Sequence, residues 1–106
     1  MAERLHLVTR ADLPAGAQAV QAAHALTEFL VKHQELAKTW REQSNTLAFL
    51  AAPDEASLAK LLDRAFDLKI RAAAFREPDL GGSLTAIAIE PAGARICRGL
   101  PLALSG

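Results

Sequence analysis

The chain has 106 residues, of which 51% are hydrophobic and 23% are charged. This length suits one compact domain over residues 1–106 and is too short for two ordinary ones, and the apolar fraction excludes a disordered tail. Twelve Lys and Arg balance twelve Asp and Glu, which excludes a protein that coats nucleic acid through a global positive field, so that any such affinity must come from a local patch.

The first predicted element is a short apolar strand at residues 5–9, which ends at the turn-forming cluster of residues 12–16. From about Ala15 to about Lys38, alanine is abundant and apolar residues recur at intervals of three to four, which predicts one long helix. The small apolar residues of its first half would let this helix lie close to a sheet. Trp40 is expected to close the end of this layer.

The second predicted strand is the continuous apolar run of residues 46–50, a pattern typical of a strand that is covered on both faces. Pro53 ends this strand, and Pro53, Asp54 and Glu55 suit the first turn of a second helix. The helix is expected to be amphipathic and to pack on a sheet. Its apolar stripe comprises Leu58, Leu61, Leu62, Ala65 and Phe66.

Two further strands are predicted at residues 71–75 and 85–90, and the polar loop of residues 77–83 separates them. The resulting order is strand, helix, strand, helix, strand, strand. This order predicts an α/β fold in three layers, in which helices pack on both faces of a mixed four-stranded sheet.

Cys97 is the only cysteine, which excludes an intramolecular disulfide and indicates a small buried thiol in a reducing compartment. The chain start has no apolar signal core, and no stretch approaches the roughly 20 apolar residues of a membrane span. We therefore expect a cytoplasmic protein without a membrane partner. His6 and His33 are expected at the surface or at an edge, and no two histidines have metal-ligand spacing, so neither a metal nor another cofactor is expected.

Polar residues follow two of the predicted strands and also line one face of the first helix. Gln21, His24 and Glu28 are three and four residues apart, so they share a helical face. His24 could act as a base near neutral pH, or its ring could simply bond to Glu28 or a backbone carbonyl. Because loops at the carboxyl ends of strands gather around one crevice, we expect this face and the loops of residues 10–16 and 77–85 to form one site.

Glu77 and Asp79 flank a proline directly after a predicted strand. Repulsion between two neighbouring carboxylates can raise the pKa of one of them, which then can act as a base beside its ionised partner. The alternative is an ordinary turn, because Asp and Pro are common turn residues. Thr85 begins the last strand, where its hydroxyl could orient a water, polarise a carbonyl or cap the strand. The motifs of nucleophile-elbow hydrolases, phosphate-loop enzymes and dinucleotide oxidoreductases do not occur.

Three segments, at residues 7–13, 21–25 and 85–91, resemble the type 2 peptidyl-tRNA hydrolase family in their order and spacing. The family motifs are an Arg-x-Asp-Leu loop, a Gln-x-x-His-Ala helix, a Trp after that helix, and a late strand that opens with Thr and closes near Pro. The residues that match are Arg10, Asp12, Leu13, Gln21, His24, Ala25, Trp40, Thr85 and Pro91. The resemblance implies a mixed four-stranded sheet between helices, often in a homodimer.

Two loops depart from the family pattern. Family members place a Gly-Lys-rich loop with an active-site lysine before the first helix, whereas residues 14–17 here are a shorter loop without lysine. Residues 76–83 replace the family's Asp-Ala-Gly loop, so that either Glu77 or Asp79 stands in for the family acid. The chain is similar in this respect to short, divergent bacterial and phage homologues with a Glu-Pro-Asp loop.

The resemblance implies that water attacks the ester carbonyl that joins a peptide to the 3′ end of tRNA. Glu77 or Asp79 would orient or deprotonate this water. Thr85 and backbone amides near the first helix would stabilise the oxyanion, and His24 would position one of these groups.

Arg10, Asp12 and Gln21 are the residues expected to bind substrate, with Arg10 contacting the terminal phosphate or ribose in place of the absent lysine. An arginine stays protonated and cannot accept a proton. Arginine in place of lysine therefore preserves substrate binding better than it preserves proton transfer. Two alternatives remain: a non-catalytic module of the same fold that binds an RNA end, a small ligand or a protein, and an enzyme for another acyl or amide bond. The Ala-rich helix face could pack on its own sheet or on a second copy, so the sequence leaves open whether the protein forms a homodimer.

Overall fold

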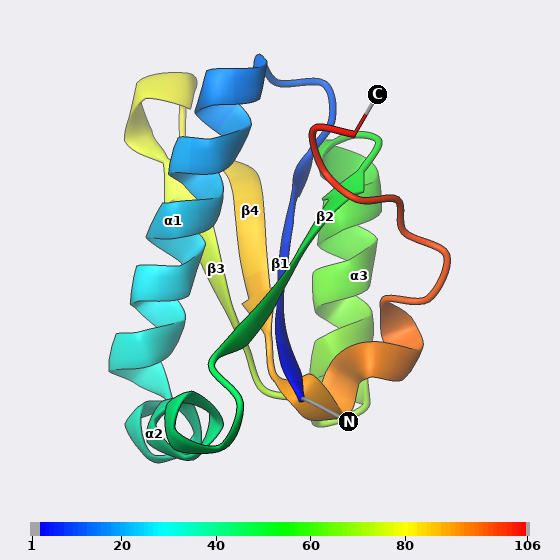
Figure 1. The fold of residues 1–106 in the computed structure, drawn as a ribbon. Helices are drawn as coiled ribbons and strands as arrows, with labels where there is room; N and C mark the ends of the chain where they lie inside the picture. Colours follow the sequence, from blue (N-terminus) through cyan, green and yellow to red (C-terminus); the bar gives the residue numbers. More distant parts are fainter. Residues whose placement is uncertain (1–2, 106) are drawn as a thin grey trace.

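A computed structural model describes residues 3–105. Its centre is a mixed four-stranded sheet in the order β2-β1-β4-β3, with α1 on one face and α3 on the other (Figure 1). The elements are β1 (Arg4–Arg10), α1 (Ala15–Lys32), α2 (Gln34–Gln43), β2 (Thr46–Ala52), α3 (Glu55–Asp67), β3 (Ala72–Glu77), the short 3-10 helix η1 (Pro78–Leu80), β4 (Ser83–Ile89) and the 3-10 helix η2 (Pro91–Ile96). The predicted three-layer α/β fold is confirmed.

The strand directions bring the predicted site loops to one edge of the sheet. β1 runs parallel to β2, and β4 runs antiparallel to both β1 and β3. The carboxyl ends of β1, β2 and β3 therefore meet the start of β4 at the upper edge in Figure 1. The register places Thr9 opposite Ala86 and Glu77 opposite Ser83, so the loops after β1 and β3 both open at this edge.

The core has one layer on each face of the sheet. Leu58 of α3 packs with Val8 and Ile87 in one layer, and Phe29 of α1 packs with Ala86 in the other. Small side chains dominate the second layer, which lets α1 lie close to the sheet. Trp40 closes the end of this layer as predicted: it is 6% exposed, and its indole N–H donates to the carbonyl of Thr46 at 2.9 Å.

The prediction of one helix to about Lys38 is wrong, because the helix breaks at His33. Its φ of −124° and ψ of 61° are not helical, and α2 starts at the next residue. Ala37 and Trp40 of α2 are buried against the sheet. A straight helix would carry these apolar side chains away from the sheet, so their burial outweighs the local helix preference.

Three other expectations about burial are wrong. Residues 46–50 are not covered on both faces, because β2 is an edge strand and Leu47 is 45% exposed. Phe66 is 83% exposed and lies outside the packed stripe of α3. His6 is only 6% exposed, because β1 is an inner strand between two helical layers. Burial lowers the pKa of His6, and its Nδ1 has no hydrogen-bond partner among residues 3–105.

Cys97 is buried as predicted, and desolvation raises its pKa to about 11. None of the helices within residues 3–105 combines the length and the apolar character that a membrane crossing needs.

Candidate active site

Gln21 connects three separate elements at the sheet edge. Its Nε2 donates to Oε1 of Glu77 at 2.9 Å, and its Oε1 accepts from the Thr85 hydroxyl at 2.6 Å. Since a carboxylate only accepts hydrogen bonds, the Nε2 of Gln21 must face Glu77 and the oxygen must face Thr85. α1, β3 and β4 are thus joined by one chain of side-chain hydrogen bonds, and the predicted meeting of the helix face with the two loops is reproduced.

Thr85 is fully buried at the inner end of this chain. Its single hydroxyl hydrogen has Gln21 as the near acceptor, with the Phe75 carbonyl at 3.3 Å as the alternative. The Thr85 carbonyl accepts from the hydroxyl of Thr9 at 3.2 Å, which ties β4 to β1. The Thr85 hydrogen is therefore committed within the protein, and the residue orients Gln21.

Glu77 ends β3 and is half-buried. Besides its bond to Gln21, its Oε2 accepts from the backbone N–H of Asp79 in a long contact of 3.4 Å. Its carbonyl accepts from Gly82 N at 2.9 Å, and the turn closes through Gly81 and Gly82 at φ of +68° and +79°. Glycine adopts this left-handed backbone readily, so a tight loop holds the Glu77 carboxylate at the sheet edge.

Asp79 occupies a different environment from Glu77. It lies in η1, is exposed, and its carboxylate makes no hydrogen bond with any residue from 3 to 105. The sequence leaves Glu77 and Asp79 as alternatives. Of the two, only Glu77 belongs to the chain of hydrogen bonds that runs through Gln21 to Thr85.

His24 lies one turn along α1 from Gln21. Its ring stacks on Phe75 with centroids 4.4 Å apart and planes at 16°. The side chain is exposed, and its nitrogens make no hydrogen bond within the described part of the chain. Neither Glu28 nor a backbone carbonyl holds the ring. The sequence analysis did not identify Phe75 as a residue of the site. The one signal for it is that it lies two residues before Glu77, on the face of the strand that points toward α1.

Arg10 and Asp12 form a bidentate ion pair beside this chain. The Nε and one terminal nitrogen of Arg10 donate to the two carboxylate oxygens at 2.9 and 3.0 Å. This hydrogen bonding lowers the pKa of Asp12 and raises that of Arg10. The other terminal nitrogen of Arg10 donates to the carbonyl of Leu84 at 3.3 Å. The guanidinium therefore lies directly next to the residue that precedes Thr85.

Two further polar residues hold the loops of the site, and sequence reasoning missed both roles. Glu55 accepts from the backbone N–H of Leu84 at 2.7 Å. Gln18, one turn before Gln21, donates to the carbonyls of Leu13 and Ala11 at 2.7 and 3.4 Å. Its Oε1 is buried without a hydrogen-bond partner among residues 3–105, so it keeps an unused acceptor. The sequence already places Gln18 on the same polar face of the helix as Gln21, but it does not show these bonds to the loop.

The arrangement suits acid–base chemistry on a water molecule. Glu77 keeps acceptor capacity on Oε2, because the contact with Asp79 N is long. Arg10 supplies a positive charge at the same edge, and His24 supplies ring nitrogens. Within residues 3–105, no group of three or more His, Cys, Asp or Glu side chains could hold a metal ion.

Comparison with known proteins adds three findings. A family model described as "Peptidyl-tRNA hydrolase PTH2" matches residues 4–100. The fold is similar to the solved structure of a protein of unknown function from Agrobacterium tumefaciens strain C58, with a TM-score of 0.70, 14% sequence identity, and coverage of 96% of this chain and 98% of that chain. A search of curated proteins found no match. The matched range contains every side chain of the candidate site.

Proposed function

The chain belongs to the peptidyl-tRNA hydrolase PTH2 family, a family of carboxylic ester hydrolases, and from this membership we propose that it hydrolyses the ester between a peptide and the 3′ end of tRNA. The observation that carries the proposal is the hydrogen-bonded chain from Thr85 through Gln21 to Glu77. It holds one carboxylate at the loop edge of the sheet, where an α/β protein receives its ligands.

In the proposed reaction, Glu77 orients a water and takes its proton as the oxygen attacks the ester carbonyl. The carbon–oxygen bond to the ribose then breaks, and the proton passes from Glu77 to the ribose oxygen, which leaves tRNA and a free peptide acid. Glu77 is favoured over Asp79, because one of its oxygens is fixed by Gln21 while Asp79 is exposed in the turn.

Gln21 and Thr85 serve as positioning residues in this proposal. Thr85 donates its hydrogen to Gln21, which orients the Gln21 amide toward Glu77. Backbone amides at the start of α1 stabilise the oxyanion. In support, Pro14 at the N-cap makes no side-chain capping bond and the first turn has no acidic residue, so these amides keep their positive potential for a ligand.

Arg10 binds the terminal phosphate or ribose in place of the family lysine. Three of its hydrogen-bond donors are used by Asp12 and Leu84, and a guanidinium has five, so two remain for a ligand. Asp12 holds the guanidinium in place. The exposed ring of His24, which stacks on Phe75 two residues before Glu77, helps to position the substrate.

A non-catalytic binding module is the competing function, and the absent lysine and shortened loops favour it. Substoichiometric protein mixed with peptidyl-tRNA separates the two. We expect free peptide to exceed the amount of protein severalfold, in a reaction that continues at constant rate. Tight binding of tRNA without release of peptide would refute the hydrolase, and equal cleavage of simple acyl esters would favour an enzyme for another acyl bond.

The proposal extends to assembly and compartment. Val20 of α1 is 54% exposed, and a second copy of the chain could cover it in a homodimer. Sedimentation equilibrium would measure the mass in solution, and a monomer at all concentrations would contradict the dimer. The proposed substrate places the protein in the cytoplasm, where translation produces peptidyl-tRNA.

A further inference from the structure

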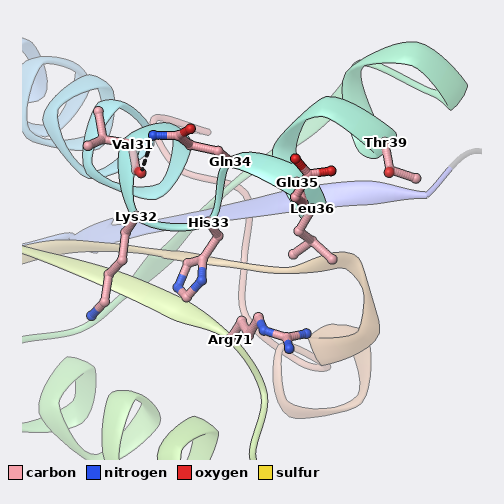
Figure 2. A pocket seen from close by; sticks show the side chains of 8 residues that line it. All are labelled: Val31, Lys32, His33, Gln34, Glu35, Leu36, Thr39 and Arg71. Atoms are coloured by element: carbon pink, nitrogen blue, oxygen red, sulfur yellow. Dashed lines mark hydrogen bonds between the residues drawn. The ribbon is translucent and has the colours of Figure 1, made fainter.

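A groove of about 620 Å³ lies at the corner between α1 and α2 (Figure 2). This corner is at the lower end of the molecule in Figure 1, away from the candidate active site. Lys32 and Arg71 project on either side of the His33 ring. Glu35 is the acidic residue among those that line this corner groove. Apart from His33, the lining carries two positive charges and one negative charge.

Among residues 3–105, the two cations of the corner groove have no protein partner. Lys32 and Arg71 are exposed, and within residues 3–105 neither side chain makes a salt bridge or a hydrogen bond. A lysine and an arginine without acidic partners have hydrogen-bond donors available for an anion.

The backbone beneath these side chains is firmly held. Arg71 N–H donates to the carboxylate of Glu90, and the Arg71 carbonyl accepts from Glu90 N at 3.0 Å. His33 Nε2 lies 3.0 Å from the carbonyl of Ala72, which fixes the corner of α1 to the start of β3. The groove therefore presents exposed charged ends on a hydrogen-bonded backbone.

The corner groove and the candidate site lie on the same flank of the molecule, formed by α1 and β3. Gln21 contacts Glu77 at one end of the flank, and His33 contacts Ala72 at the other. A rise of 1.5 Å per residue puts His33 about 18 Å from Gln21 along the helix. Between them, the exposed His24 ring stacks on Phe75.

We propose that the corner groove binds backbone phosphates of the tRNA, while the unpaired 3′ nucleotides lie along α1 and β3 toward Glu77. A span of about 18 Å corresponds to roughly five phosphate steps of a stacked strand at about 3.4 Å each. An extended polyanion fits Lys32 and Arg71 better than a single phosphate, because these side chains diverge around His33 (Figure 2). The stacked rings of His24 and Phe75 suit unpaired bases, which bind to aromatic faces.

Binding of deacylated tRNA as a function of salt tests this proposal directly. The groove variant is Lys32→Ala/Arg71→Ala, and the matched control is Lys60→Ala/Arg64→Ala, which removes two exposed charges from α3 on the opposite face. Loss of two phosphate contacts should reduce the slope of log K against log salt by about 1.4 to 1.8. The control should keep the slope of the natural protein. Equal slopes in all three proteins would overturn the proposal.

The proposal rests on the proposed hydrolase, and a second measurement separates their failures. With peptidyl-tRNA, the groove variant should raise KM severalfold at unchanged kcat, whereas peptidyl-adenosine, which ends before the groove, should show no change. Increased KM for both substrates would contradict the assigned path of the tRNA. If no protein releases peptide, the hydrolase is refuted, while a salt slope that falls only in the groove variant still supports the phosphate site.

Discussion

The amide nitrogen of Gln21 donates a 2.9 Å hydrogen bond to the carboxylate of Glu77, from a side chain that is only 6% exposed. Replacing a buried amide of this kind by an apolar side chain costs free energy of folding, because its partners lose their hydrogen bonds. The bond therefore links the buried interior of the sheet edge to the acid that we propose activates the water.

The effects of Gln21→Leu and Thr85→Val on turnover should be far from additive. If Thr85 acts only through Gln21, either variant should lower kcat by about 10-fold, equivalent to about 1.4 kcal/mol, and the double variant should be little worse. KM should change little if Gln21 acts by positioning Glu77 rather than by binding the substrate. A double-mutant cycle on kcat measures this coupling, and fully additive losses would assign Thr85 an independent role.

Replacing Arg10 by lysine should weaken substrate binding more than turnover. Lysine keeps the charge but cannot reproduce the bidentate pair with Asp12 while also reaching the Leu84 carbonyl. We expect KM for peptidyl-tRNA to rise by about 3- to 10-fold, or up to about 1.4 kcal/mol, at nearly constant kcat. Steady-state kinetics check this, and a loss confined to kcat would place Arg10 in the chemical step.

The stability of the protein should fall as the pH drops below about 6.5, the ordinary pKa of histidine. Burial lowers the pKa of His6 in the folded state, so the unfolded chain binds the proton first and unfolding is favoured in this range. Above pH 6.5 both states are neutral at this residue, and it contributes no pH dependence. Denaturant unfolding of the natural protein and of His6→Leu, between pH 7.5 and 5.5, measures the effect. The variant should lose less stability, and parallel curves would contradict this origin.

Gly93→Ala should destabilise the fold by about 1–3 kcal/mol through overpacking. A Cβ at Gly93 would overlap the Cγ2 methyl of Ile89 and lie 3.0 Å from that of Ile70. Both isoleucines are buried, so neither can move away freely. Gly16 in α1 is the matched control, because nothing lies within 4 Å of an added Cβ there. Chemical denaturation should show Gly16→Ala unchanged or stabilised by up to about 1 kcal/mol, and equal losses in both variants would be inconsistent with this packing.

The arrangement of layers could be predicted from the sequence because each element has its own local signal. Asp54 caps α3 by accepting from Ser57 N at 2.9 Å, as the polar first turn after Pro53 suggested. The break at His33 has no such signal. It arises because Ala37 and Trp40 must cover the sheet, and that requirement exists only in the folded protein.

The sequence predicts which candidate residues lie near one another, but it does not show which of them are in contact. The spacing of Gln21 and His24 places them on one face of α1, and the position of Glu77 places it at a strand end. The sequence does not show that Gln21 bonds to Glu77 or that His24 stacks on Phe75, since these pairs are 56 and 51 residues apart in sequence. The sequence also does not show which of the two nearby acids is held: Glu77 bonds to Gln21 of α1, whereas Asp79 is exposed in η1.

The central claim is that Glu77, and not Asp79, activates the water that cleaves the ester. The most direct test is the rate of peptide release from peptidyl-tRNA by Glu77→Gln and by its matched control Asp79→Asn, each with folding verified by thermal unfolding. We predict that Glu77→Gln lowers kcat by about 100-fold or more, the range of a lost general base, and that Asp79→Asn stays within about 3-fold of the natural protein, a difference below about 0.7 kcal/mol. Undiminished peptide release by Glu77→Gln would contradict the account.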